Sequence, residues 1–252
     1  MRSRSGIILC LAMLVAVSAA GSLRAEEAPV TCDVPDSLLS TESPLNKVAD
    51  AIKANRPLDI LVIGSRSSTI VSSDNSAYPA RLQAVLKERL PQATINLAVE
   101  IQAKKTAEEV VSNLPRFLEG RKPTLVIWQT GTVDAMRSVD PEEFRNTIDE
   151  GVAALQNAGA DVILINPQYS PRTETMISVP PYIDNMRVVA QQRDIPLFDR
   201  FAIMRQWNDQ GDFDLFSAAH GIDLAMRVHD CLGRALSKFV IDAAHLGPAQ
   251  QN

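Results

Sequence analysis

The chain has 252 residues, of which 46% are apolar, and a formal net charge of −5 at pH 7. This length suits one well-buried domain and is too short for two domains of comfortable size. The mild acidity and the lack of a basic stripe argue against a nucleic-acid partner, and a mean hydropathy of −0.02 is typical of a soluble protein.

Residues 1–25 have the pattern of a cleaved signal peptide. Arg2 and Arg4 form a basic start, and residues 6–17 form an apolar run. This run is shorter than the roughly 20 residues that a membrane-spanning helix needs. We therefore expect export to the periplasm or the outside of a bacterium, with no transmembrane segment after cleavage. Residues 26–44 are polar and rich in Pro and Ser, so they are expected to form an extended arm.

From residue 45 to residue 245, apolar strands alternate with amphipathic helices, and no repeat or linker divides this domain. The expected strands are residues 58–63, 93–99, 125–128, 161–166 and 196–198. The expected helices are residues 45–53 (capped by Ser43), 78–90, 106–118 (interrupted near Pro115), 141–157, 182–193, 200–208 and 223–243. This alternation predicts a five-stranded parallel sheet with helices on both faces, an α/β/α sandwich. Residues 246–252 are expected to be a flexible tail.

Cleavage of the signal peptide leaves two cysteines, Cys32 and Cys231. In an oxidising compartment such a pair forms a disulfide, which here would tie the N-terminal arm to the last helix. Two separate thiols are an equally good interpretation. The three histidines of the chain stand in no metal-ligand spacing, so neither a metal nor another cofactor is expected.

Residues 123–135 carry the most informative pattern of the chain. The continuous apolar run from Leu125 to Trp128 predicts a strand buried on both faces, which ends at the polar turn from Gln129 to Thr132. Open parallel sheets bind their ligands at the edge where such turns lie. The sequence Gly131-Thr-Val-Asp134 resembles the third sequence block, Gly-x-Asn-Asp, of the SGNH (GDSL-type) hydrolases.

The resemblance runs from about residue 58 to residue 240 and implies the SGNH hydrolase fold, with a flavodoxin-like sheet and degenerate catalytic blocks. It also implies a serine nucleophile after the first strand. The family has Gly-Asp-Ser-x-Thr there, and this chain has Gly64-Ser-Arg-Ser-Ser-Thr69. With one inserted residue Ser67 is the nucleophile, and Ser65 is the second choice. A serine-rich turn without a catalytic role is the alternative.

Two further blocks bear on the oxyanion hole and the general base. Ala98 stands where the family has a glycine whose amide donates to the oxyanion, and Val133 replaces the asparagine that supplies another donor. The family's Asp-x-x-His is inverted here as His220-Gly-Ile-Asp223. This implies His220 as base with Asp223 as its partner, or else His229 as base. Both histidines can instead be ordinary polar residues.

The resemblance therefore implies an exported ester hydrolase, an acyl or acetyl esterase acting on carbohydrate or cell-envelope material through a serine nucleophile. Arg66, Val133 and the inverted block favour an alternative, a catalytically inactive protein of this fold that binds a glycan or envelope partner in the same cleft. Arg66 would suit an anionic ligand. In either case the expected partner is a small molecule or glycan, and the sequence leaves catalysis open.

Overall fold

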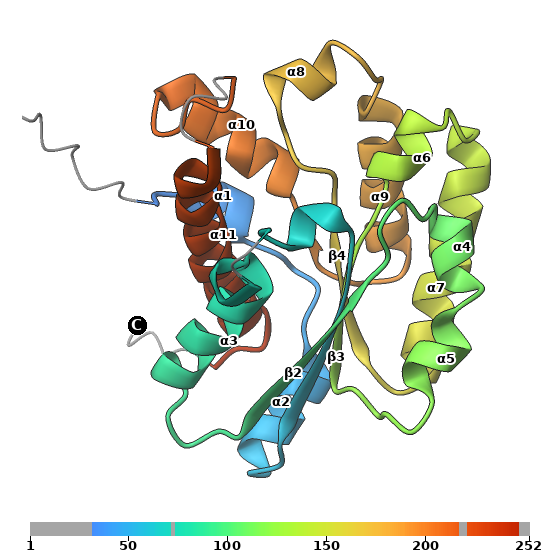
Figure 1. The fold of residues 1–252 in the computed structure, drawn as a ribbon. Helices are drawn as coiled ribbons and strands as arrows, with labels where there is room; N and C mark the ends of the chain where they lie inside the picture. The colour runs from blue at the N-terminus through green and yellow to red at the C-terminus, as the bar shows by residue number, and fades with distance from the viewer. Residues whose placement is uncertain (1–31, 72–73, 217–220, 247–252) are drawn as a thin grey trace, which may run out of the picture. The chain divides into compact units, whose positions relative to one another are not determined.

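Parallel strands form a five-stranded sheet in the order β2-β1-β3-β4-β5 within the described part of the chain (Figure 1). The strands are β1 (Leu58–Gly64), β2 (Ile95–Ile101), β3 (Leu125–Gln129), β4 (Asp161–Ile165) and β5 (Leu197–Phe198). Nearly every residue of β1, β3 and β4 is buried, because helices cover both faces of the sheet. The α/β/α sandwich with flavodoxin-like strand order is thus confirmed.

The computed structural model describes residues 32–71, 74–216 and 221–246, which belong to one compact unit beginning at Cys32. The helices are α1 (Asp36–Leu39), α2 (Asn46–Lys53), α3 (Tyr78–Arg89), α4 (Ala107–Val111), α5 (Leu114–Leu118), α6 (Thr132–Met136), α7 (Pro141–Asn157), α8 (Pro171–Glu174), α9 (Pro180–Gln192), α10 (Arg200–Gln210) and α11 (Gly221–Ala243), with 3₁₀ turns η1 (Arg66–Ser68) and η2 (Asp74–Ser76). None of these helices is long and apolar enough to cross a membrane. The predicted signal peptide and residues 247–252 of the predicted tail lie outside the described residues.

Several predicted elements differ from the structure in their bounds by one or two residues, and two differences are larger or bear on the site. The arm predicted as extended contains the short helix α1, and β2 covers residues 95–101 instead of 93–99. The break in the helix predicted near Pro115 lies between α4 and α5, where Pro115 occupies the first turn of α5.

The predicted cap of the first long helix is also wrong. Helix α2 begins at Asn46, after Leu45, and no side chain at that position caps it. Instead Asp161, the first residue of β4, accepts the Val48 backbone N–H through Oδ2 at 3.0 Å. A carboxylate at a helix N-terminus stabilises the free N–H groups there. A contact across 113 residues is not visible in a local sequence pattern.

The helices lie in two layers. Figure 1 shows α3 and α11 on one side of the sheet and α4, α7 and α9 on the other. On the second side, buried side chains form a continuous core that includes Leu61, Val126, Trp128, Phe144 and Met186. This core holds β1 and β3 in place, and these strands end at the site described below.

Close packing between α7 and β3 predicts that Gly151→Ala destabilises the protein. A Cβ atom at Gly151 would lie 2.6 Å from Trp128 Cζ3 and 2.8 Å from Val111 Cγ2. Trp128 is fully buried and has no room to move. We expect the free energy of unfolding, measured in urea, to fall by about 1–3 kcal/mol, even though alanine favours helix by about 1 kcal/mol. An unchanged or higher value would contradict this packing.

Candidate functional site

Polar side chains gather where β1 and β3 end, at the carboxyl edge of the sheet. Strand β1 ends at Gly64, and η1 then turns the chain so that Ser68 folds back over the strand end. A Cβ atom at Gly64 would lie 2.4 Å from Ser68 Oγ, so only glycine fits here. The turn leaves Ser65 and Ser67 partly exposed at the edge.

Gln129, the last residue of β3, holds the serines together. Its Nε2 donates to Ser65 Oγ at 2.6 Å and to Ser67 Oγ at 3.0 Å, and these two hydroxyl oxygens are 3.1 Å apart. Its Oε1 accepts hydrogen bonds from Ser68 Oγ and, at 3.3 Å, from Arg200 Nη1. Because the Gln129 side chain is itself buried, the network is fixed in place.

Arg200 places a buried positive charge behind Ser67. It is the first residue of α10, directly after β5, and only 1% of it is exposed. Its Nη2 lies 3.3 Å from Ser67 Oγ, and Nη1 lies 3.4 Å from the Ser67 carbonyl oxygen. Burial lowers the pKa of the guanidinium to about 10, so it stays protonated at neutral pH. Among the described residues its Nε has no hydrogen-bond partner.

His229 lies in α11 but is not joined to the serines. It is buried, and its Nδ1 accepts the backbone N–H of Tyr78 at 3.0 Å. Burial, and then the charge of Arg200, lower its pKa to about 4, so the ring is neutral at neutral pH. Within the described residues no hydrogen bond connects His229 with Ser65 or Ser67. The geometry therefore does not give His229 the role of general base.

His220 lies outside the described residues, and Asp223 is exposed in the first turn of α11. Ala98 lies inside β2, where it pairs with Leu61 of β1. Leu61 comes three residues before the end of β1 at Gly64, so at about 3.3 Å per residue Ala98 lies about 10 Å from the carboxyl edge. Ala98 thus lies within the sheet and not at its carboxyl edge, because β2 extends further than expected.

Val133 does lie at the site, in α6. Together with Ser65 and Gln129 it lines a cavity of about 10 Å³. That is space for about one water molecule. The isopropyl group of Val133 donates no hydrogen bond. The neighbouring Asp134 is structural, since its Oδ1 accepts the Ala107 N–H at the start of α4 at 2.8 Å, and burial raises the pKa of its carboxyl group.

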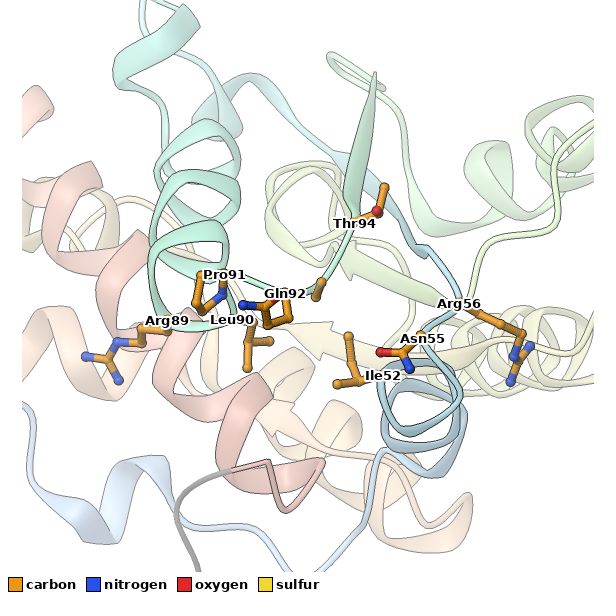
Figure 2. A pocket seen from close by; sticks show the side chains of 9 residues that line it. Ile52, Asn55, Arg56, Arg89, Leu90, Pro91, Gln92 and Thr94 are labelled. Atoms are coloured by element: carbon orange, nitrogen blue, oxygen red, sulfur yellow. The ribbon is translucent and has the colours of Figure 1, made fainter.

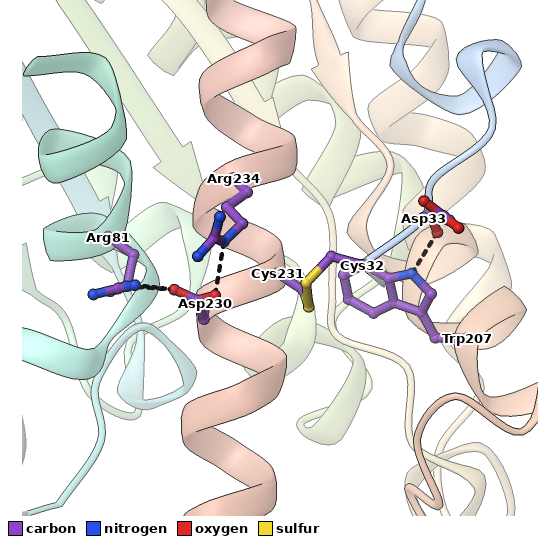
Figure 3. The surroundings of a disulfide bond; sticks show 7 residues. All are labelled: Cys32, Asp33, Arg81, Trp207, Asp230, Cys231 and Arg234. Atoms are coloured by element: carbon purple, nitrogen blue, oxygen red, sulfur yellow. Dashed lines mark hydrogen bonds and ion pairs between the residues drawn. A yellow bond between two sulfur atoms is a disulfide. The ribbon is translucent and has the colours of Figure 1, made fainter. Parts of the chain in front are cut away.

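A disulfide joins Cys32 to Cys231, one of the two interpretations left open by the sequence, with the Cα atoms 5.1 Å apart (Figure 3). Beside it, Trp207 Nε1 donates to the Asp33 carbonyl oxygen at 2.8 Å. The segment at Cys32 is thereby attached to both α10 and α11, the helices that carry Arg200 and His229.

A larger hollow lies at the opposite edge of the sheet. This pocket has a volume of about 230 Å³ and is lined by the chain ends of α2 and α3 (Figure 2). Its two arginines, Arg56 and Arg89, point away from it, while Ile52 and Leu90 lie between them (Figure 2). Because it lies away from the carboxyl edge, where open parallel sheets bind their ligands, this pocket is not the candidate site.

Two residues of the site do not emerge from the sequence. The sequence assigns Gln129 only to a polar turn, although a polar side chain at the very end of an apolar strand signals the carboxyl edge. Arg200 stands between Asp199 and Phe201, directly after the last strand. A charged residue at that place is a usable signal, but nothing local shows that its side chain reaches Ser67.

Comparisons with known proteins agree on the fold. Residues 31–246 match the Non-GDSL lipase-like family. No curated protein sequence matches the chain. Similar solved structures include TesA (19% identity, TM-score 0.58, 73% of this chain and 99% of that chain) and the acetylxylan esterase Axe2 from Geobacillus stearothermophilus (16%, 0.60, 73% and 94%). A third is CEX, a two-domain esterase active on acetylated mannans (16%, 0.62, 83% and 57%). At these identities the structures establish a common fold.

Proposed function

This chain belongs to the Non-GDSL lipase-like family, and from that premise we propose that it is an ester hydrolase with Ser67 as nucleophile. The observation that carries the proposal is the position of Ser67: partly exposed at the carboxyl edge, with its Oγ 3.0 Å from Gln129 Nε2 and 3.3 Å from Arg200 Nη2. A hydroxyl at this edge, surrounded by donors, suits nucleophilic attack on an ester.

The proposed substrate is an acyl or acetyl ester of carbohydrate or cell-envelope material. Acetylated xylan and mannan are the substrates named for Axe2 and CEX, which share this fold. We place the enzyme in the periplasm or outside the cell. The signal-peptide pattern supports this, and so does the disulfide, because such bonds persist in oxidising compartments.

In the proposed reaction the Ser67 oxygen attacks the ester carbonyl, the alcohol leaves with a proton, and water then hydrolyses the acyl-enzyme. His220 as general base and Asp223 as its partner remain part of the proposal. The valine at position 133 lowers the expected rate, since loss of one oxyanion donor costs about 10²- to 10³-fold.

In the purified chain without its predicted signal peptide, Ser67→Ala is expected to lower the rate of p-nitrophenyl acetate hydrolysis to the rate measured without enzyme. Ser65→Ala is the matched control, because it removes a neighbouring hydroxyl in the same turn and leaves the nucleophile in place. Release of acetate from acetylated xylan, measured for the same three proteins, tests the substrate class. Equal turnover by the wild type and Ser67→Ala would remove Ser67 from the mechanism.

A second candidate function is supported by one observation. No histidine among the described residues is hydrogen-bonded to Ser65, Ser67 or Ser68, as a catalytic serine would require. Under this second candidate the chain is catalytically inactive and binds a glycan or envelope partner in the same cleft. Titration of acetylated xylo-oligosaccharide into the purified chain, followed by calorimetry, separates the two candidates. Binding without turnover favours the inactive binding protein. The absence of both binding and turnover would contradict both candidates.

A further inference from the structure

The guanidinium of Arg200 is an unusual group to bury. Buried charges are normally paired with an opposite charge, because the loss of hydration is large. Burial is the main cause of the lowered pKa of Arg200, and the group that opposes it is the Tyr78 hydroxyl and not a carboxylate. Its contacts with Ser67 and Gln129 are long, at 3.3 to 3.4 Å. Replacing buried charged groups by apolar side chains of similar volume is often neutral or stabilising, so the charge calls for a functional reason.

The titratable groups around Arg200 do not neutralise it. Burial raises the pKa of Tyr78, so its hydroxyl stays protonated. Burial and Arg200 itself keep His229 neutral, as described above. Arg66, on the same turn as Ser67, is exposed and also positive. At neutral pH the site therefore carries a net positive charge directed at Ser67.

The hydrogen-bond donors around Ser67 Oγ outnumber what a hydroxyl can accept. Gln129 Nε2 lies at 3.0 Å, Arg200 Nη2 at 3.3 Å and Arg200 Nη1 at 3.4 Å. A hydroxyl oxygen has two lone pairs and one proton to donate, whereas an alkoxide has three lone pairs and no proton. Three N–H donors match the alkoxide.

The neighbouring hydroxyl of Ser65 is not free to accept the proton of Ser67. Ser65 Oγ already accepts from Gln129 Nε2 at 2.6 Å and from the Ser67 backbone N–H at 3.3 Å. Both of its lone pairs are thus used, and it is a poor acceptor for the proton of Ser67. The pair of serines is surrounded by donors that suit the loss of one proton.

We propose that Arg200 is a further catalytic residue, which together with Gln129 stabilises negative charge on the Ser67 oxygen; this rests on the proposed function. Ser67 Oγ gives its proton to solvent hydroxide, which becomes water, and its electron pair forms the bond to the acyl carbon. The guanidinium keeps its own protons throughout. Charge-assisted N–H···O⁻ bonds shorten to about 2.7–2.9 Å, so the long contacts tighten as the charge develops.

Covalent labelling by a fluorophosphonate tests this step directly. The Ser67 oxygen forms a bond to phosphorus, the phosphorus–fluorine bond breaks, and fluoride leaves. The rate of mass increase is measured across the neutral and alkaline range for the wild type, Arg200→Met and Arg200→Lys. We expect Arg200→Met to label about 10²-fold more slowly and to reach its plateau rate at higher pH, whereas Arg200→Lys stays within about tenfold of the wild type. The melting temperature of Arg200→Met should be unchanged or higher.

Three outcomes would overturn the proposal. Labelling of Arg200→Met at the wild-type rate, with an unaltered pH profile, would overturn the role of Arg200 and leave the proposed hydrolase function standing. Equal slowing in Arg200→Met and Arg200→Lys, with lower melting temperatures in both, would make Arg200 a structural residue. A wild type that neither labels at Ser67 nor turns over p-nitrophenyl acetate would overturn the proposed function and this inference together.

Discussion

Cys231→Ser is expected to lower the free energy of unfolding by about 5 kcal/mol. The disulfide joins residues 199 apart, so it closes a loop that contains most of the described chain. The entropy that a crosslink removes from the unfolded chain grows with the logarithm of the loop length, which puts this bond near the top of the usual range. Small domains are stable by about 5–15 kcal/mol, so the variant should be marginal.

Urea denaturation with and without reductant measures this effect. The wild type in reductant should fall to the value of Cys231→Ser, and Cys32→Ser should show the same loss. The double variant Cys32→Ser/Cys231→Ser should lose no more than either single one. A difference in free energy of unfolding below about 1 kcal/mol between the wild type and Cys231→Ser would contradict this expectation. It would mean that residual structure already restricts the unfolded chain without the disulfide.

Local contacts also connect the disulfide to the site. Next to Cys231, Asp230 forms ion pairs with Arg81 of α3 and, at 2.8 Å, with Arg234 (Figure 3). His229, the residue before Asp230 in α11, accepts the Tyr78 N–H of α3. The disulfide thus holds one side of α11 while α3 holds the other, which fixes the helix that borders the serine network.

Elements with local signals could be predicted from the sequence. Helix α7 has the predicted bounds because Asp140 accepts the N–H groups of Glu142 and Glu143 at its start. Strand β3 could be predicted because a short continuous apolar run is typical of a strand that is buried on both faces of a sheet. Helix α2 shows the limit: its capping carboxylate, Asp161, comes from another strand, and only the assembled sheet brings it there.

The candidate site could be predicted only where its residues have a local sequence signal. The turn at Ser67 follows from the end of β1, since a parallel sheet places such turns at its ligand-binding edge. The role of Arg200 does not follow, because its side chain reaches a residue 133 positions away. The sequence ends β2 two residues too early, and a shift of this size moves Ala98 from the expected edge into the sheet.

Acid is expected to destabilise the protein through His229. Its pKa is about 4 in the folded chain, below its ordinary value of 6.5, because of burial and then the charge of Arg200. Unfolding at low pH therefore takes up a proton. Above about pH 6.5, His229 does not lower the free energy of unfolding. This free energy falls progressively as the pH drops from about 6.5 toward about 4. The difference between the two pKa values corresponds to about 3 kcal/mol.

Denaturation in urea at a series of pH values, for the wild type and His229→Gln, isolates this loss. The glutamine Oε1 can accept the Tyr78 N–H but does not titrate, so the variant should lose about 3 kcal/mol less than the wild type between about pH 6.5 and 4. Carboxyl groups contribute equally in both proteins and cancel. His245→Gln, a change at an exposed histidine near the end of α11, is the matched control. Parallel curves for the wild type and His229→Gln would contradict the expected shift.

The same titration tests how His229 and Arg200 act on each other. Protonation makes both ring nitrogens of His229 donors, so the Tyr78 N–H loses its acceptor, and the charge on the ring is then repelled by the charge of Arg200. In Arg200→Met the second charge is gone and only burial lowers the pKa of His229. The acid loss should therefore shrink without vanishing, because burial is the larger cause. An acid loss unchanged in Arg200→Met would mean that the guanidinium lies too far from the imidazole, or is too well screened, to act on it.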